Sequence, residues 1–173
     1  MMYFECKNFV GTDNGIIDVV ASDSAMGLLK TSEIESIKVW LPLHLSLGKF
    51  NSLEPFNRNE LLQYDENVSY NFEEDVNRLK ELMNDNRTIR VWASHTDINE
   101  YRLLLLICYL FKNNNISVFF AEDFNKYAFC IGSISDDELI NIDKKEHVLT
   151  QKQKEDYSDE WIKIVNEDKN SAI

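Results

Sequence analysis

The sequence predicts an α/β protein with a mostly parallel sheet of about four to five strands and helices on both faces, in a three-layer, Rossmann-like arrangement, plus a C-terminal helical appendage. Three observations lead to this prediction. Short, apolar, partly β-branched segments alternate with helical segments up to residue 131, which is typical of a parallel sheet covered on both faces. The chain is 44% hydrophobic, enough for a buried core, and its five Gly and two Pro are too few for a loop-rich chain. Beyond residue 134, two capping-box spacings indicate two helices.

Apolar runs and capping residues place the individual elements. The strands expected are residues 16–21, 37–41, 88–93, 116–121 and, as a weaker fifth, 127–131. The helices expected are a segment from the polar turn 22–24 to about residue 31, then residues 72–83, 97–111, 136–142 and 151–167. The N-terminal capping pairs are Asp97 with Glu100, Ser135 with Glu138, and Thr150 with Gln153.

We expect the chain to have two parts. Residues 1–134 form the α/β domain, with residues 1–14 as an N-terminal extension, and residues 135–173 form a C-terminal helical module packed on it. The last helix of this module has an apolar face made of Tyr157, Trp161, Ile164 and Val165. Such a face docks on the sheet domain or on a partner. The nearest approach to a linker is residues 48–71, where polar residues interrupt any period.

The chain is strongly acidic, with 30 Asp and Glu against 18 Lys and Arg and a formal net charge of -12. Residues 54–85 carry a net charge of -6, and residues 135–173 carry -5. Nucleic acids and anionic membranes attract Lys and Arg, so we expect neither direct nucleic-acid binding nor membrane binding. An acidic surface suits a basic protein partner, and it also keeps a protein soluble without any partner.

The cysteines and the apolar runs indicate a cytoplasmic protein. Cys6, Cys108 and Cys130 are odd in number, far apart and without a C-x-x-C spacing, so neither a disulfide framework nor a zinc knuckle is expected. The N-terminus lacks the apolar run behind a basic start that a signal peptide would have. The longest apolar run, residues 103–111, is about half of the roughly 20 residues that span a bilayer.

Polar residues gather where the predicted strands end, which is where ligands bind in open parallel sheets. They are Ser22, Asp23 and Ser24 after the first strand, His44 and Ser46 after the second, Ser94, His95 and Asp97 after the third, and Glu122 and Asp123 after the fourth. The catalytic candidates are Asp23, His44 and His95. The ligand-binding candidates are Ser22, Asp23, Ser24, Ser46, Trp92, Ser94 and Asp97.

Each candidate has a chemical role and a simpler alternative. Asp23 would orient a ligand hydroxyl or a metal, Ser24 at a helix N-terminus would take an anion, and a histidine would transfer a proton. The alternative for Asp23 and Ser24 is helix capping. The alternative for His44 and His95 is a solvated or hydrogen-bonded side chain. The two histidines with Asp97 or Asp23 would also suit an acid/base pair or a metal site, although spacing alone assigns no metal.

No motif identifies a cofactor. Neither G-x-G-x-x-G nor the phosphate loop G-x-x-x-x-G-K-[ST] occurs, and the G-x-S-x-G elbow of serine hydrolases is absent. Trp92 closes an apolar strand, where core packing is the ordinary role of a tryptophan and a stacking wall of a ligand cleft is the alternative. The cofactor is therefore left unassigned.

Two functional hypotheses follow. In the first, the protein binds or transforms a small phosphate-bearing or nucleotide-like ligand at the carboxyl ends of the strands, with Arg87, Arg90 or Arg102 offsetting the negative charge. In the second, it is an acidic interaction module, an adaptor or inhibitor without catalytic activity, that docks on a basic partner through residues 54–85 and 135–173. The sequence leaves open whether the protein is an enzyme.

Several of these segments resemble a known family. They are residues 22–28 (Ser-Asp-Ser-Ala-Met-Gly-Leu), 45–48 (Leu-Ser-Leu-Gly), the strand 89–94 with Trp92, and the leucine-rich helix after it. Together they resemble the uncharacterised bacterial domain of unknown function eighteen-thirty-five, whose first turn reads Gly-Asp-Ser, with Ser22 in the glycine place here. Its second loop has paired aspartates and Gly-Pro, where this chain has Leu43, His44 and Lys49. Residues 131–161 resemble the small helical module that often follows that domain. The resemblance covers roughly residues 15–168 and implies an α/β fold and a bacterial cytoplasmic protein, without an activity.

Overall fold

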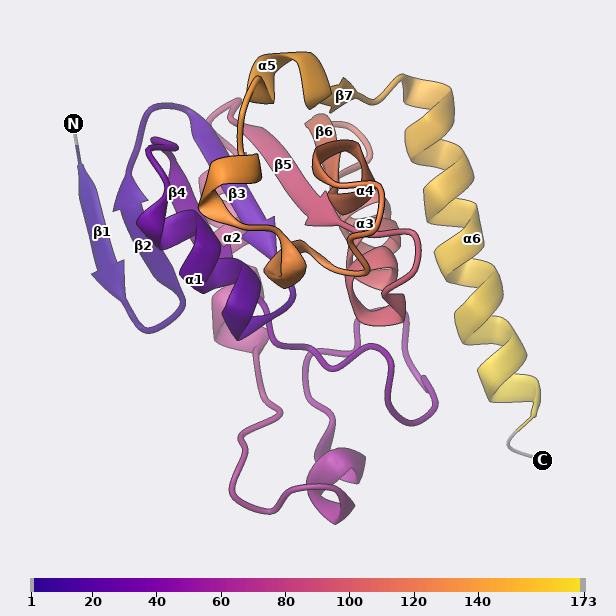
Figure 1. The fold of residues 1–173 in the computed structure, drawn as a ribbon. Coiled ribbons are helices and arrows are strands. Elements are labelled where there is room, and N and C mark those ends of the chain that lie inside the picture. Colours follow the sequence, from indigo (N-terminus) through magenta and orange to yellow (C-terminus); the bar gives the residue numbers. More distant parts are fainter. Residues whose placement is uncertain (1, 172–173) are drawn as a thin grey trace.

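The computed structural model describes residues 2–171 and contains a mixed β-sheet flanked by helices (Figure 1). Its strands are β1 (Tyr3–Cys6), β2 (Phe9–Thr12), β3 (Ile16–Val20), β4 (Ile37–Trp40), β5 (Thr88–Ala93), β6 (Asn115–Phe120) and β7 (His147–Val148). Its helices and helical turns are α1 (Asp23–Thr31), η1 (Asn59–Gln63), α2 (Glu73–Met83), α3 (Ile98–Phe111), α4 (Ala121–Phe124), η2 (Ile131–Ser133), η3 (Asp136–Glu138), α5 (Ile142–Lys145) and α6 (Gln151–Asn170). Met1, Ala172 and Ile173, at the outer ends of the predicted extension and helical module, lie outside the described residues.

The sheet has seven strands in the order β1-β2-β4-β3-β5-β6-β7, so the prediction of four to five mostly parallel strands was wrong for the sheet as a whole. The central strands β4, β3, β5 and β6 are parallel, with Val19 opposite both Val39 and Val91. The outer strands run antiparallel to their neighbours. They escaped prediction because Phe9 is the only buried residue of β1 and β2, and β7 has two exposed residues. Short edge strands lack the continuous apolar run of a central parallel strand.

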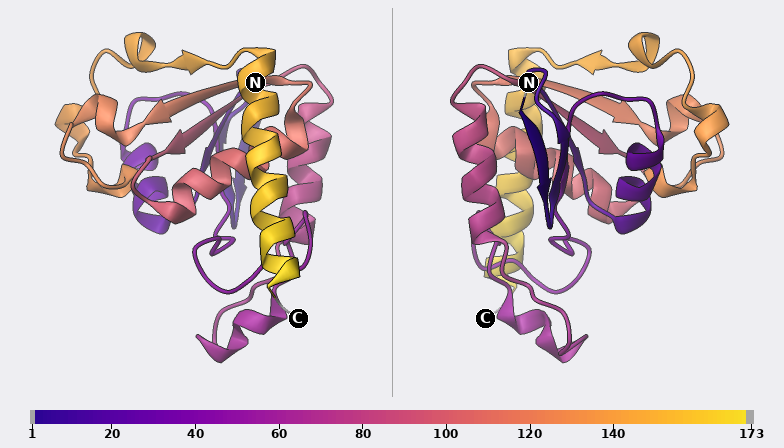
Figure 2. Two further views of the ribbon diagram at one scale, coloured as in Figure 1. Left: turned by 90° about the vertical axis from the view of Figure 1, so that its right-hand side faces the viewer. Right: turned by 90° about the vertical axis from the view of Figure 1, so that its left-hand side faces the viewer.

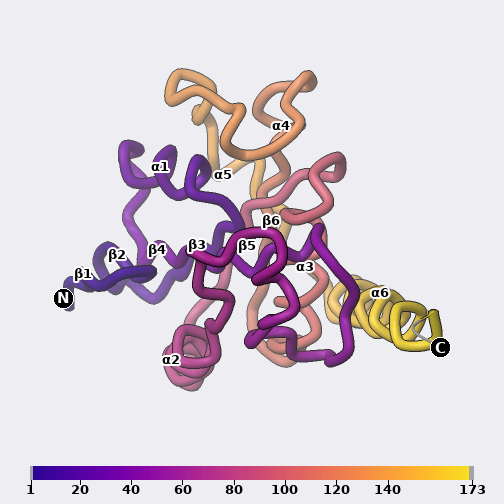
Figure 3. The backbone as a smooth tube through the Cα atoms, turned by 90° about the horizontal axis from the view of Figure 1, so that it is seen from below, coloured from indigo at the N-terminus to yellow at the C-terminus, as the bar shows by residue number. Residues whose placement is uncertain are grey.

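Each face of the sheet has its own hydrophobic core, because side chains alternate along a strand. Ile17 and Val19 contribute to the core under α2 and α3. Val20 and Trp92 contribute to the other core, under α1. Figure 3 shows α1, α4 and α5 on one side of the sheet and α2 and α3 on the other. The protein is therefore layered helix, sheet, helix.

The C-terminal helix α6 packs against α3 and crosses it on one side of the molecule (Figure 2). Tyr101 of α3 donates its hydroxyl hydrogen to Glu160 at 3.0 Å. Trp161, on the predicted apolar face of α6, is fully buried, and its indole N–H donates to the carbonyl of Leu53 at 3.0 Å. None of the helices within residues 2–171 combines the length and the apolar composition needed to cross a membrane.

The predicted fifth strand, residues 127–131, is not a strand. Its backbone groups bond to side chains instead of to a neighbouring strand. The carbonyl of Phe129 accepts from the Thr96 hydroxyl at 3.0 Å, and the N–H of Ile131 donates to Glu100 at 3.0 Å. These partners lie about 30 positions earlier in the chain, so a local apolar run could not reveal them.

The predicted helix at residues 136–142 is also wrong, although its capping box is present. The side chains of Ser135 and Glu138 exchange the expected hydrogen bonds with the backbone, but the turn η3 ends at Glu138. Asn141 then has a left-handed φ of 54° directly before α5. A left-handed residue cannot continue a right-handed helix, so two short turns replace one helix.

The predicted linker, residues 48–71, is anchored to the sheet domain. Phe50 and Phe56 are buried, and the Arg58 side chain is 2% exposed. The Arg58 guanidinium donates to the carbonyl of His44 at 2.8 Å and lies 4.8 Å from the ring of Phe50. Figure 2 shows that the part around η1 projects away from the sheet. The segment is therefore an anchored loop beyond the carboxyl ends of the central strands.

Candidate functional site

The carboxyl ends of β5 and β6 carry a hydrogen-bonded cluster around Glu122. The hydroxyl of Ser94 lies 2.7 Å from Glu122 Oε1, and the backbone N–H of His95 donates to the same oxygen at 2.9 Å. The His95 ring stacks on Phe120, with its Nδ1 3.7 Å from Glu122 Oε2. Burial by itself would raise the pKa of Glu122, but the hydrogen bonds from Ser94 and His95 outweigh burial and lower it. Glu122 is therefore an ionised acceptor at neutral pH.

Glu100, in the first turn of α3, is a buried carboxyl at the same end of the sheet. It is 1% exposed, and its two oxygens accept the N–H of Ile131 at 3.0 and 3.1 Å. Burial raises the pKa of Glu100 to about 8; the Ile131 N–H opposes this, and the charges of Asp97 and Glu122 add to it. At pH 7 the protonated form of Glu100 therefore predominates. Oxygen and sulfur atoms of Asp97, Glu100 and Cys130 all lie within 4.8 Å of one another.

The start of α1, where the sequence predicts an anion site, packs against η2 on one side, while Asp23 and Ser24 are exposed. Ser22 is the N-cap of α1, and its hydroxyl accepts from the N–H of Ala25 at 3.2 Å. Gly132 of η2 lies so close to Ser24 that a Cβ on the glycine would be 2.1 Å from Ser24 Oγ. Asp23 is exposed on the first turn of the helix. Thus η2 packs against Ser24 on one side of the helix N-terminus and leaves Asp23 and Ser24 exposed on the other.

The two candidate histidines have different surroundings. His44 packs edge-on against Tyr70, with 5.2 Å between the ring centroids, whereas His95 stacks on Phe120. Burial, with a contribution from the charge of Arg58, lowers the pKa of His44, so its imidazole is neutral at pH 7. Within residues 2–171, the group of two carboxyls and a thiol around Glu100 is the only one with metal-ligand spacing, and it contains neither histidine.

The other candidate residues are separated by their elements. Ser46 is exposed on the loop after β4. Trp92 is fully buried, and its indole N–H donates to Asp18 at 2.7 Å. Asp97 caps α3 by accepting the N–H of Glu100 at 2.9 Å. Ser94 and Asp97 thus belong to the cluster at the ends of β5 and β6, while Ser46 and Trp92 lie elsewhere.

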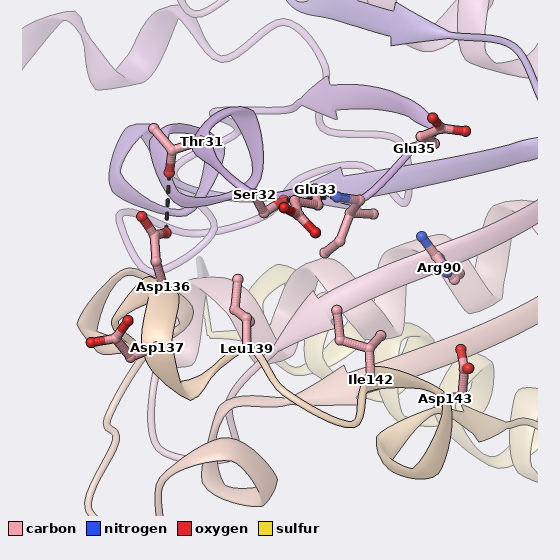
Figure 4. A pocket seen from close by; sticks show the side chains of 11 residues that line it. Thr31, Ser32, Glu33, Glu35, Arg90, Asp136, Asp137, Leu139, Ile142 and Asp143 are labelled. Atoms are coloured by element: carbon pink, nitrogen blue, oxygen red, sulfur yellow. Dashed lines mark hydrogen bonds between the residues drawn. The ribbon is translucent and has the colours of Figure 1, made fainter.

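A cavity of about 550 Å³ lies at the other end of α1 (Figure 4). Its walls come from the α1–β4 connection, residues 31–35, and from residues 136–143 of η3 and α5. The carboxylates that line it are Glu33, Glu35, Asp136, Asp137 and Asp143, and the apolar side chains are Ile34, Leu139 and Ile142. Thr31 donates its hydroxyl hydrogen to Asp136 at 3.1 Å and so joins the two walls (Figure 4).

A row of buried charged residues lies along the sheet at this cavity. Lys38, Asp18 and Arg90 are neighbours on β4, β3 and β5, because Asp18 is in register with both bases. Arg90 lines the cavity and makes a bidentate pair with Asp18 at 2.8 and 2.6 Å. Lys38 donates to the carbonyl of Ile34, in the cavity wall, at 2.6 Å. Both bases are therefore engaged within the protein.

The electrostatics of the cavity are dominated by its carboxylates. Burial by itself would lower the pKa of Arg90, but the hydrogen bonds and charge of Asp18 outweigh burial and raise it. Burial lowers the pKa of Lys38, and the charge of Asp18 opposes this. Within residues 2–171, none of the five cavity carboxylates lies within salt-bridge distance of a base. The cavity is therefore a negatively charged site.

Sequence reasoning missed this cavity because its walls are distant in the chain. Thr31 and Asp136, which touch across it, are 105 positions apart. A signal was nevertheless present: Asp18, Lys38 and Arg90 each interrupt an apolar strand at its second or third residue. Charged residues inside central strands are unusual and need partners.

Comparisons with known proteins gave no guide to this site. The sequence matches no protein-family model, and no curated protein or solved structure is significantly similar to it. The resemblance to the domain of unknown function eighteen-thirty-five therefore stays a prediction. The function has to be inferred from the geometry and charge of the site.

Proposed function

We propose that the protein is an acidic interaction module that binds a basic segment of a partner protein in the cavity between α1 and α5. The observation that carries this proposal is the set of five carboxylates, none of which forms a salt bridge within residues 2–171, around a space of about 550 Å³. This volume lies within the roughly 300–1,000 Å³ of typical ligand pockets. The acidic segment 135–173 supplies one wall.

The chemistry of the walls favours lysine or arginine side chains as occupants. Both have an apolar stem and a cationic end. The stem would pack on Ile34, Leu139 and Ile142, and the cationic end would pair with the carboxylates. A net charge of -12 would also accelerate the approach of a basic partner at low salt.

A phosphate-bearing ligand at the strand ends is the weaker proposal. Asp97 and Glu122 make that end of the sheet acidic, and Gly132 packs against Ser24 at the start of α1. An anion there would meet these carboxylates. The helix dipole, which favours anions by about 0.3–1 kcal/mol, would have to offset that repulsion.

The test is a binding titration with short labelled peptides. We would compare an arginine-rich, a lysine-rich and a glutamate-rich peptide, followed by fluorescence anisotropy at low and at physiological salt. The cavity variant is Glu33→Gln with Asp137→Asn. The matched control is Glu74→Gln with Glu81→Gln, which removes the same charge from exposed positions on α2.

We expect the basic peptides alone to bind, and to bind more weakly with added salt. Because each exposed charge pair contributes about 0.2–1 kcal/mol, the cavity variant should lose affinity by about tenfold and the control by less than about twofold. Equal losses in both variants would mean that net charge, and not the cavity, binds the peptide. No binding of basic peptides at low salt would refute the proposal.

A further inference from the structure

Arg90 lines the acidic cavity, and only part of its guanidinium is used inside the protein. Its Nε donates to Asp18 Oδ1 at 2.8 Å, and its Nη2 donates to Asp18 Oδ2 at 2.6 Å. A guanidinium carries five N–H groups, two of which belong to Nη1. Within residues 2–171, Nη1 has no hydrogen-bond partner. Asp18 therefore holds the guanidinium in place and leaves its Nη1 unbonded.

The unbonded Nη1 is accessible from the cavity. The Arg90 side chain is 10% exposed. In the described part of the chain, the buried side-chain polar atoms that lack a partner belong to Asn8, Ser36, Trp40 and Glu122, so Nη1 is not one of them. Figure 4 shows the nitrogen end of Arg90 turned toward the other residues that line the cavity. A donor fixed in a nearly buried side chain and left without an acceptor suggests that a ligand supplies the acceptor.

The charges around Arg90 decide which kind of acceptor suits it. Asp18 already pairs with Arg90, and the charges of Asp143 and Glu146 also act on it. A carboxylate or phosphate of a ligand would be repelled by these carboxylates and by those on the cavity walls. A carbonyl oxygen accepts an N–H without bringing a charge, and the main chain of a peptide supplies one at each residue.

We propose that Arg90 recognises the main chain of the bound basic segment. Its Nη1 donates to a backbone carbonyl oxygen of the partner residue whose cationic side chain pairs with the cavity carboxylates. This inference rests on the proposed function and narrows the class of ligand. A polyamine has the same positive charges and an apolar stem, but it has no acceptor for Nη1. The cavity therefore selects a lysine or arginine that belongs to a peptide over a free polyamine.

The test compares argininamide with agmatine, which has the same guanidinium and amino groups but no carbonyl. At about pH 6 both amino groups are protonated, so the two probes carry the same charge. The pair variant is Asp18→Asn with Arg90→Met, which leaves no buried charge unpaired and keeps an acceptor for the Trp92 indole. The matched control makes the same two changes, Asp13→Asn with Arg87→Met, in a bidentate pair outside the cavity.

Binding at low salt is followed by NMR. We expect argininamide to bind the wild type about tenfold more tightly than agmatine, the effect of one hydrogen bond to a charged donor. Argininamide should also shift the side-chain N–H signals of Arg90, which agmatine should leave in place. The preference for argininamide should disappear in the pair variant and persist in the matched control.

If argininamide binds no better than agmatine, or if the Arg90 signals do not move, the inference is overturned, and the wild type alone decides this even if the pair variant does not fold. A preference that persists in the pair variant would overturn it as well, because another donor would then contact the carbonyl. The titration with basic peptides decides separately whether basic segments bind, so the proposed function can stand when this inference fails.

Discussion

Replacing Glu100 with glutamine is expected to stabilise the protein at neutral and alkaline pH. The carboxyl is 1% exposed, and burial raises its pKa from 4.5 to about 8. The folded state therefore holds this proton more tightly than the unfolded state. The stability that the protonated group contributes is fully present below about pH 4.5 and is lost as the pH rises to about 8. A pKa shift of one unit corresponds to about 1.4 kcal/mol in the free energy of unfolding, so the shift from 4.5 to about 8 corresponds to about 5 kcal/mol.

Glutamine retains an oxygen that can accept the N–H of Ile131, but it cannot ionise. We expect Glu100→Gln to match the wild type in free energy of unfolding near pH 4.5 and to exceed it by several kcal/mol, at most about 5, near pH 8. Because about 1 kcal/mol changes the Tm of a domain of this size by about 2–4 °C, the Tm near pH 8 should rise by about 10 °C. Urea unfolding followed by tryptophan fluorescence over this pH range measures the difference.

Glu122→Gln is the matched control, because it makes the same chemical change in a carboxyl whose pKa is lowered. Folding favours the ionised form of Glu122, so its amide variant should be less stable than the wild type at neutral pH. The two variants should therefore shift stability in opposite directions near pH 8. If Glu100→Gln were less stable than the wild type near pH 8, or kept the wild-type pH dependence, the buried carboxyl would not be the titrating group.

Two further predictions concern packing and buried charge. Gly132→Ala places a methyl group 2.1 Å from Ser24 Oγ and should lower the free energy of unfolding in urea by about 1–3 kcal/mol. Adding Ser24→Gly to the same chain should restore part of this loss. An unchanged stability of Gly132→Ala would contradict the close packing. Asp18→Ala leaves Arg90 buried without a counter-charge and should cost about 3–5 kcal/mol. Asp143→Ala, at an exposed position, should change the free energy of unfolding by less than about 0.5 kcal/mol. A similar loss in both variants would show that the pairing of Asp18 with Arg90 is not the cause.

The elements that the sequence could predict are those specified by neighbouring residues. The four central strands are apolar nearly throughout, and α3 and α6 begin where Asp97 and Thr150 cap them. A cap and the N–H groups that it accepts lie within three residues of each other, so a local pattern identifies both. The same holds for Ser135, whose capping box is present although the helix after it is not.

The elements that were predicted wrongly or missed depend on hydrogen bonds to residues far away in the chain. Residues 127–131 are apolar enough for a strand, but the N–H of Ile131 bonds to Glu100. The hairpin of β1 and β2 extends the sheet by pairing with β4, although little of it is buried. Neither outcome can be read from a window of sequence, because the deciding hydrogen bonds join segments about 30 residues apart.

Only part of the candidate site could be predicted from the sequence, again because local patterns do not show contacts between distant segments. Polar residues after the strands do gather where Ser94, His95 and Glu122 meet, which the rule for parallel sheets anticipates. The acidic cavity lies at the opposite end of α1, where the rule does not point. It exists because residues 136–143 fold back over the α1–β4 connection and bond to Thr31.

The buried charges at the acidic cavity are not required for folding, and they fit the proposed binding of a basic segment. A buried ion pair such as Asp18 with Arg90 is weak evidence for stability, since apolar replacements of similar volume are often neutral or stabilising. The valines beside them, Val19 and Val91, already fill the opposite core. Asp18 neutralises Arg90, and Lys38 donates to the carbonyl of Ile34 in the cavity wall. Arg90 and Lys38 lie near Asp143 and Glu35 and are influenced by their charges. Within residues 2–171, however, they form no salt bridge with the five carboxylates, and in the proposed function a basic side chain of the partner would pair with these.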